Sequence, residues 1–269
     1  MITLSDEEFD EISNFIYTHY GVNLKKKRSL IEARLGFHIF ASGYKSYKEY
    51  LNAVRSNPSK RAHEELVSRL TTNHTFFMRE KDHFTFYTET VLPWIENVLQ
   101  ERDLRVWSAG CASGEEPYTL SLCTFAYLGT KVQNWDTTIL ASDISARALT
   151  IAKEGVYPTA NLSALPESWI KKYFQPISDG KYKVSNVLRK SVAFRKINLM
   201  DPFVFKRPLQ TIFCKNVMIY FDDAIRTELL RKFYEVLRPG GYLFVGHSES
   251  LSTLKHDFEY IAPSIYRKG

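Results

Sequence analysis

The residues with the clearest chemical potential lie in a glycine-bearing loop that ends in two adjacent carboxylates. Residues 104–120 read LRVWSAGCASGEEPYTL, so an apolar run gives way to Gly110 and Gly114, and Glu115 and Glu116 follow at once. A phosphate-binding loop needs backbone N–H groups and positive charge at this point. The loop matches neither GxGxxG nor GxxxxGKS/T, which argues against a dinucleotide pyrophosphate and against a P-loop.

Two further polar groups follow expected strands later in the chain. Asp143 comes shortly after the run 137–141, and CKNVMIY (214–220) ends the run 209–214. Open α/β sheets bind ligands beyond the carboxyl ends of their strands, so we expect these groups to face one ligand. Asp143 can accept hydrogen bonds from ribose hydroxyls, while Glu115 or Glu116 can meet a cationic group. A ligand with a ribose but no phosphate fits, and S-adenosylmethionine has that chemistry.

Simpler interpretations exist for each of these residues. The glutamate pair can stabilise the first turn of a helix through its dipole, and Asp143 can cap the following helix. Residues 247–249 (HSE) resemble the members of a catalytic triad, but consecutive side chains cannot converge, so we expect a loop at the end of a strand. Taken together, the glycine loop, Asp143 and the segment 214–220 favour a ligand site.

An alternation of strands and helices after residue 104 provides the framework for these groups. It predicts an α/β fold with a parallel, doubly wound sheet. Polar residues between 173 and 195, with Asp179–Gly180 as a turn signal, predict a small antiparallel β insert. The expected strands are 104–109, 137–141, 192–197, 209–214 and 242–245, the expected helices are 119–127, 146–153 and 222–237, and a hairpin at 258–261 and 264–267 closes the sheet.

The first hundred residues have the periodicity of helices. Ser5 is a plausible N-cap and Gly21 ends the first helix, and further helices are expected at 31–43, 46–54, 59–70 and 84–99, the last containing Pro93. We therefore expect a helical N-terminal domain over 1–82, continued by a linker helix to about 100, and a second domain over 83–269 that contains the insert.

Composition and charge narrow the class of protein. The chain has 269 residues and three cysteines, with no CxxC pair, which is typical of a reducing cytoplasm. No segment has the length and apolarity of a membrane span, and the acidic start is unlike a signal peptide. Between Lys25 and Arg61 ten basic residues face only two acidic ones, so this stretch favours an acidic partner, unless it is simply a solvated helical face.

Five motifs in order give the sequence a family resemblance: LTTNHTFFMRE, RVWSAGCASGEEPYTL, ILASDIS, FCKNVMIYF and LFVGHSES. Together they resemble the chemotaxis receptor methyltransferases (CheR-type), which methylate receptor glutamates with S-adenosylmethionine. The resemblance covers nearly the whole chain. It implies a Rossmann-like methyltransferase sheet with a helical N-terminal domain, S-adenosylhomocysteine as the product, and no metal.

The resemblance also implies roles for individual residues. Arg79 and Tyr220 are the expected catalytic residues near the transferable methyl group, Asp143 takes the ribose hydroxyls, and Glu116, in preference to Glu115, takes the amino end of the cofactor. The remaining expected cofactor contacts are Asn73, Thr75, Arg79, Asn198, Leu199, Asn216 and Val217. The family usually has two phenylalanines directly before the arginine, whereas here Met78 intervenes. Asn73 and Thr75 can otherwise be helix caps, and Asn198 a turn residue.

The same resemblance implies partners. A positive N-terminal face docks on the cytoplasmic helical region of methyl-accepting chemotaxis receptors, and the candidates here are Arg28, Arg34 and Lys45. Binding of a receptor C-terminal tail peptide is less expected, because the turn SDGKY (178–182) is shorter and poorer in glycine than in tether-binding members. We expect a monomer that binds no nucleic acid and does not insert into a membrane.

Two other functions compete with receptor methylation. NVMIY resembles the Asn-Pro-Pro-Tyr loop of amino methylases acting on nucleic acids, but Met218 and Ile219 replace the two prolines. A non-catalytic, cofactor-sensing module would not need both Arg79 and Tyr220. An acceptor glutamate, with a pKa of about 4.3, is ionised at neutral pH and needs no general base. The absence of a convincing His–Asp or Cys–His pair therefore agrees with carboxylate methylation.

Overall fold

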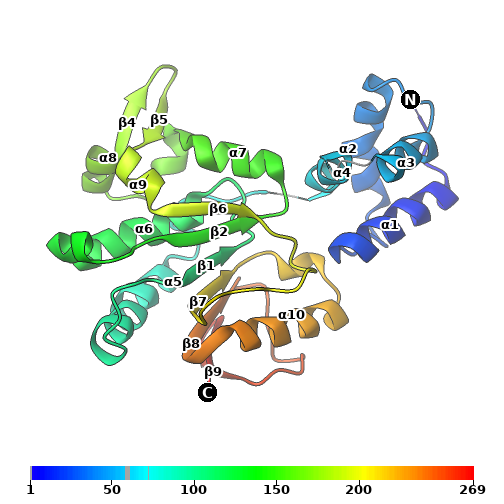
Figure 1. Cartoon of the computed structure of the whole chain (residues 1–269). Helices are drawn as coiled ribbons and strands as arrows, with labels where there is room; N and C mark the ends of the chain where they lie inside the picture. The colour runs from blue at the N-terminus through cyan, green and yellow to red at the C-terminus, as the bar shows by residue number, and fades with distance from the viewer. Residues whose placement is uncertain (1, 58–60, 72) are drawn as a thin grey trace.

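A bundle of four helices forms the N-terminal part of the chain: α1 (Asp6–Tyr20), α2 (Arg28–Ala41), α3 (Tyr47–Ser56) and α4 (Arg61–Leu70). The computed structural model describes residues 2–57, 61–71 and 73–269, so the expected start of the fourth helix at Ser59 lies outside the described residues. The bundle stands beside the larger α/β part and has its own apolar core (Figure 1). The predicted helical N-terminal domain is confirmed.

The first helix begins and ends where local sequence signals predict. The Ser5 hydroxyl accepts a hydrogen bond from the Glu8 backbone N–H at 3.2 Å, and the Glu8 carboxylate accepts one from the Ser5 N–H at 3.0 Å. This reciprocal capping box satisfies two N–H groups that no helix turn can pair. Gly21 ends the helix in the left-handed conformation, with a φ of 71°.

A seven-stranded sheet organises the rest of the chain, in the order β6-β2-β1-β7-β8-β10-β9. Five strands are parallel and the C-terminal hairpin is antiparallel, as expected. Since β1 lies between β2 and β7, the strand order reverses beside it, and the loops after β1 and β7 flank the switch point. The strands are β1 (Val106–Ala109), β2 (Ile139–Asp143), β6 (Val192–Lys196), β7 (Leu209–Cys214), β8 (Leu237–Val245), β9 (Phe258–Ala262) and β10 (Ile265–Lys268).

Helices cover both faces of this sheet. Along β7, Ile212 and Cys214 join the core beneath α10 (Asp223–Val236), whereas Phe213 points to the opposite face, as strand alternation requires. That opposite face packs against α6 (Glu115–Leu128) and the segment that follows α5 (Lys81–Phe86). Three further helices of this domain are α7 (Ala146–Glu154), η3 (Gly129–Asn134) and η5 (Met218–Tyr220).

The predicted helix 84–99 is not one regular α-helix. α5 continues into two π-helical segments, η1 (Tyr87–Val91) and η2 (Trp94–Val98), on either side of Pro93. Proline has no N–H to donate within a helix and its ring crowds the preceding turn, so the hydrogen-bond pattern shifts around it. Among the described residues no helix has the length and apolarity needed to cross a membrane.

The small antiparallel sheet differs in extent from the predicted insert over 173–195. Its order is β3-β5-β4, with β3 (Val156–Pro158), β4 (Phe174–Ile177) and β5 (Lys181–Val184). β3 comes from upstream and is too short for a sequence pattern, while 192–195 belongs to β6 of the large sheet. The predicted turn at Asp179–Gly180 is present, with positive φ at both residues. The connecting helices are η4 (Thr159–Leu162), α8 (Glu167–Tyr173) and α9 (Asn186–Lys190).

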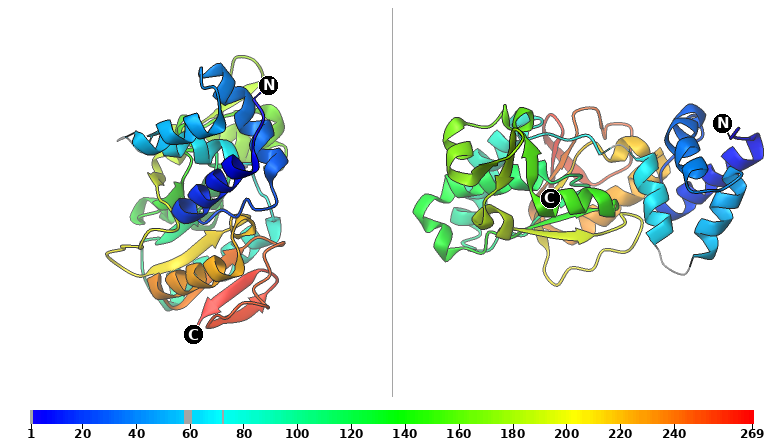
Figure 2. Two further views of the ribbon diagram at one scale, coloured as in Figure 1. Left: turned by 90° about the vertical axis from the view of Figure 1, so that its right-hand side faces the viewer. Right: turned by 90° about the horizontal axis from the view of Figure 1, so that it is seen from above.

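The helical bundle covers the carboxyl edge of the large sheet, as the views in Figure 2 show. Ser68 and Ser145 hydroxyls lie 2.7 Å apart across the junction of α4 and α7. The Tyr17 hydroxyl donates to the Asp222 carboxylate at 2.7 Å, before α10. The backbone N–H of residue 23 donates to the carbonyl of Tyr220 at 2.8 Å. The bundle therefore forms one wall of any cleft at the switch point.

Candidate active site

A cleft lies between the helical bundle and the carboxyl ends of β1, β2 and β7. Segments distant in sequence line it, among them residues 73–79, the loop after β1 and the loop after β7. The predicted catalytic and cofactor-binding residues that line it are Asn73, Thr75, Arg79, Glu116, Asp143, Asn198, Leu199, Asn216, Val217 and Tyr220; of these two groups only Glu115 does not.

The two adjacent glutamates point to different surroundings. The Glu115 side chain accepts hydrogen bonds from the Ser113 hydroxyl at 2.7 Å and from the Asn161 amide at 3.3 Å, and the residue is only 2% exposed. Burial raises the pKa of Glu115 above its ordinary value. Glu116 lines the cleft and accepts from the Ser108 hydroxyl at 2.7 Å. Successive helix positions point about 100° apart, so only one of the pair can face a ligand in the cleft.

The loop after β1 reaches the loop after β7 because it contains glycine at the point of closest approach. Gly110 has a φ of 87°, and a Cβ there would lie 2.3 Å from a Val217 methyl group. Ala112, with a φ of 46°, continues the turn in a conformation that non-glycine residues rarely adopt. Such strain is typical of functional sites. Any side chain at Gly110 would therefore push the two loops apart.

Asp143 lies at the carboxyl end of β2 with both carboxylate oxygens held by backbone groups. One oxygen accepts from the Ala112 N–H at 2.9 Å and the other from the Ser145 N–H at 2.8 Å. The helix cap of α7 is the Ser145 hydroxyl, so the capping alternative for Asp143 is wrong. Burial raises the pKa of Asp143. Each carboxylate oxygen has a second lone pair, which leaves Asp143 able to accept hydroxyl groups of a ligand.

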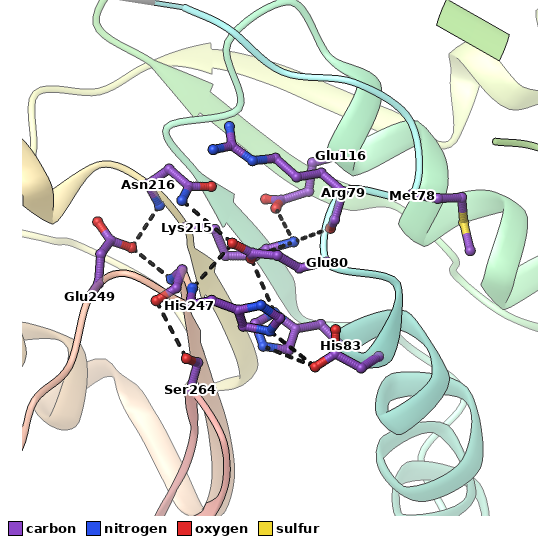
Figure 3. A network of polar contacts seen from close by, with 12 residues as sticks. Met78, Arg79, Glu80, His83, Glu116, Lys215, Asn216, His247, Glu249 and Ser264 are labelled. Carbon is purple, nitrogen blue, oxygen red and sulfur yellow. Dashed lines mark hydrogen bonds and ion pairs between the residues drawn. The ribbon is translucent and has the colours of Figure 1, made fainter. Parts of the chain in front are cut away.

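The segment that carries Arg79 makes two unusual backbone turns, at Met78 and Glu80, whose φ angles are 60° and 59°. Arg79 donates to the His74 carbonyl at 2.8 Å, and its guanidinium lies 5.8 Å from the centre of the Phe76 ring. The side chains of Met78 and Arg79 point in opposite directions (Figure 3). The extra methionine before the arginine therefore packs away from the cleft and leaves Arg79 on the cleft wall.

Lys215 is a site residue that the sequence reasoning missed. Its ammonium lies 3.4 Å from a Glu80 oxygen and 3.4 Å from a Glu116 oxygen, and it donates to the Arg79 carbonyl at 2.8 Å (Figure 3). The side chain is almost fully buried, so these carboxylates compensate a charge that water cannot reach. A lysine directly after the expected strand 209–214 was the available signal. Lys215 joins the Arg79 segment to Glu116 across the base of the cleft.

Glu249 is the second residue missed. It is 1% exposed, and its carboxylate accepts hydrogen bonds from the backbone N–H groups of Asn216 and Gly246 at 2.6 Å each and of Ile219 at 3.1 Å. Asn216 has a φ of 60°. Burial raises the pKa of Glu249. The predicted loop after β8 is present. From this loop Glu249 holds the loop after β7, which ends at Tyr220.

A further group of polar side chains lies beside Glu80, on the side away from Glu116 (Figure 3). His247 contacts the Asp82 carboxylate at 3.0 Å, and the rings of His247 and His83 meet edge to face with centres 4.8 Å apart. Burial and the nearby Lys215 charge lower the pKa of His83 to about 4, so its imidazole is neutral at neutral pH. No pattern in the sequence connects Asp82 and His83 with His247.

The remaining predicted residues have contacts of their own. Asn198 accepts from the Met200 N–H at 3.1 Å and donates to the His19 carbonyl at 2.8 Å, so it shapes a turn as well as lining the cleft. α5 has no side-chain cap, so neither Asn73 nor Thr75 caps it. Leu199 is buried in the core beneath α10.

The three predicted docking residues lie on the bundle and do not line the cleft. Arg28 pairs with Asp6 and donates to the Leu4 carbonyl at 2.8 Å, and Arg34 donates to the Thr71 carbonyl at 2.7 Å. Both guanidinium groups therefore hold the bundle together. Lys45 is exposed.

Two family models match the chain. One is described as the CheR methyltransferase SAM binding domain and matches residues 73–266, and the other as the CheR methyltransferase all-alpha domain and matches 7–71. A chemotaxis protein methyltransferase of Borreliella burgdorferi is 39% identical over 100% of this chain and 96% of its own length. The chemotaxis protein methyltransferase of Escherichia coli is 34% identical over 98% and 92%, and chemotaxis protein methyltransferase 2 of Vibrio cholerae 34% over 96% and 90%.

Proposed function

We propose that this chain, which belongs to the CheR methyltransferase family, transfers a methyl group from S-adenosylmethionine to glutamate side chains of chemotaxis receptors. The products are glutamate methyl esters and S-adenosylhomocysteine. One observation carries the proposal: a single cleft at the switch point brings Arg79 and Tyr220 together with Glu116 and Asp143. These groups match the acceptor carboxylate, the amino end and the ribose that the reaction requires.

The residues of the cleft fit the cofactor by their chemistry. Asp143 would accept the ribose hydroxyls, because its two oxygens have more lone pairs than the backbone N–H groups use. Glu116 would meet the ammonium of the amino acid end, while Asn198 and Leu199 would flank the adenine. Val217 packs at the Gly110 turn and would close the floor with Asn216, and Asn73 and Thr75 would complete the opposite wall.

The reaction depends on the alignment of the acceptor carboxylate with the methyl group more than on general acid or base catalysis. When bound, S-adenosylmethionine supplies an activated methyl group that an ionised carboxylate can take without a general base. Arg79 would hold the acceptor carboxylate by charge-assisted hydrogen bonds, and Tyr220 would fix its direction of approach. Alignment of this kind contributes up to about 7–11 kcal/mol in favourable systems. Lys215 and Glu249 would act as positioning residues, since they hold the segments that carry Arg79 and Tyr220.

We propose that residues 1–82 form the receptor-docking domain and residues 83–269, with the small sheet as an insert, the methyl-transfer domain. The acidic partner would be the cytoplasmic helical region of the receptor. Arg28 and Arg34 are engaged within the bundle, so the exposed Lys45 and the exposed run at 25–27 are the stronger docking candidates. That run lies beside the cleft, because Asn23 contacts the Tyr220 carbonyl. Receptor tail peptide and nucleic acid are not required, and the enzyme would act as a monomer.

A direct assay tests the proposal against its rivals. The chain is incubated with methyl-labelled S-adenosylmethionine and either receptor-containing membranes or nucleic acid. We expect label only on the receptor, released as methanol by mild base, because carboxyl methyl esters are base-labile. Base-stable label, or label on nucleic acid, would contradict carboxylate methylation. Absence of label despite tight cofactor binding would support a non-catalytic sensing module instead.

A further inference from the structure

One carboxylate and two imidazoles converge behind the cofactor cleft, where the start of α5 meets the loop after β8. One ligand atom each from Glu80, His83 and His247 lies within 4.8 Å of the others (Figure 3). Glu80 and His83 are separated by three positions, which puts both on one side of the first turn of α5. His247 reaches them from the end of β8. No residue of this group lines the cleft.

Buried polar atoms in this cluster have unused hydrogen-bonding capacity. The side chain of His83 is 0% exposed, yet neither ring nitrogen has a hydrogen-bond partner among the described residues, and the same holds for the Oε2 atom of Glu80. The closest approaches are 3.5 Å from His83 Nδ1 to Glu80 Oε2 and 3.4 Å from Lys215 Nζ to the same oxygen. An unsatisfied buried group costs about 1–3 kcal/mol, so the two His83 nitrogens, beside a carboxylate oxygen that only the Lys215 ion pair compensates, call for an unseen partner.

The donor set identifies the kind of partner. Imidazole nitrogens with a carboxylate oxygen are typical ligands of Zn²⁺ and neighbouring divalent transition metals, at about 2.0–2.2 Å. Asp82 contributes a second feature of such sites, because its carboxylate lies 3.0 Å from His247 Nε2. That contact leaves the other nitrogen of the His247 ring for a metal and fixes the orientation of the ring. A tetrahedral site would need the three ligand atoms to close in by roughly 1 Å.

We propose that Glu80, His83 and His247 bind one divalent transition-metal ion of the zinc type, with Asp82 orienting His247. The family resemblance implies no metal, and the sequence alone does not bring His247 together with Glu80 and His83, which lie far from it in the chain. None of the three ligands lines the cleft, and Glu80 meets it only through Lys215 and Asn216, so the role of the ion would be structural. The ion would join the start of α5 to the loop that carries Glu249, and would leave Lys215 paired mainly with Glu116.

The test is metal binding by the full-length, untagged chain after chelator treatment. We expect one equivalent of Zn²⁺ in competition with a chromophoric chelator and a rise in melting temperature on adding Zn²⁺. Co²⁺ should give the visible absorption of a site with nitrogen and oxygen ligands. His247→Gln should abolish Zn²⁺ binding and the rise in melting temperature. The side chain of His247 is 46% exposed, so the variant should still fold. Asp82→Asn should weaken Zn²⁺ binding about 10–100-fold.

His63→Gln is the matched control, because it removes a histidine of the bundle that lies outside this cluster. Equal Zn²⁺ affinity in the wild type, His247→Gln and His63→Gln would overturn the proposal, as would the absence of any binding by the chelator-treated wild type. Either result would leave receptor methylation untouched, since no cleft residue is altered.

Discussion

The Glu249 carboxylate accepts a hydrogen bond from the backbone N–H of Asn216 at 2.6 Å, across 33 positions of sequence. The same side chain also binds the N–H groups of Ile219 and Gly246. A buried carboxylate thereby stabilises a loop in which Asn216 has a positive φ and which ends at Tyr220. The geometry of Tyr220 depends on a residue that never reaches the cleft.

Replacing Glu249 by glutamine should lower both stability and turnover. The amide keeps one acceptor oxygen but turns an NH₂ group towards N–H donors, so at least one backbone donor becomes unsatisfied. We expect a loss of about 1–3 kcal/mol in the free energy of unfolding, measured by urea denaturation, and a reduced methyl-transfer rate at saturating cofactor. Glu259→Gln, at an exposed carboxyl on β9, is the control. Wild-type stability and rate in Glu249→Gln would show that the loop holds its shape unaided.

Substitutions of the two adjacent glutamates should have different effects on the binding of S-adenosylmethionine. Glu116→Gln removes a charge from the cleft and should weaken S-adenosylmethionine binding at least about tenfold, since hydrogen bonds to charged groups contribute about 1.5–3 kcal/mol. Glu115→Gln is the isosteric control and should leave the dissociation constant nearly unchanged, because Glu115 does not line the cleft. Calorimetric titration measures both. A larger effect at position 115 than at 116 would contradict the assignment.

Glu115 should also contribute to the pH dependence of stability. Because burial raises its pKa, the folded state takes up a proton at higher pH than the unfolded chain does. The free energy of unfolding therefore gains a contribution as pH falls from neutrality towards 4.5, and loses it as pH rises. Glu115→Gln should remove this contribution and change the slope of unfolding free energy against pH in that window. Parallel curves for wild type and variant would refute the prediction, with Glu259→Gln again as control.

Arg79→Ala should affect catalysis more than cofactor affinity. The guanidinium is the group proposed to hold the acceptor carboxylate, so its loss should lower turnover by about tenfold to a hundredfold at saturating cofactor. The dissociation constant for S-adenosylmethionine should change much less. Arg79→Lys, which keeps the charge but loses the planar fork, should give an intermediate rate. Equal turnover in wild type and Arg79→Ala would eliminate the catalytic role.

Receptor docking should depend on salt and on exposed lysines of the bundle. Charges separated by more than about 8–10 Å are largely screened at physiological ionic strength, so the Michaelis constant for the receptor should increase with added salt. Lys45→Glu should raise that constant severalfold without changing turnover of bound receptor. Lys131→Glu, a charge reversal on η3, is the control. Insensitivity to both salt and Lys45→Glu would place the docking surface elsewhere.

The sequence by itself determined those features whose causes lie within a few residues. The Ser5 capping box, the Gly21 helix end and the Asp179–Gly180 turn depend on local hydrogen bonds and on backbone preferences. The alternation of strands and helices predicted the order of the elements. From that order followed the expectation that Asp143 and the loops after two other strands lie at the same carboxyl edge of the sheet. The family motifs supplied the residues Arg79 and Tyr220.

Only the tertiary structure decided how distant segments meet. Glu116 faces the cleft while Glu115 turns towards Asn161, a choice that depends on the rotation of α6 against the sheet. Lys215 lies between two carboxylates, and Glu249 holds the Asn216 loop, because the strand order brings β7 and β8 together beside the switch point. Burial then makes these contacts obligatory, since a buried charge or N–H group must find its partner wherever the fold places one.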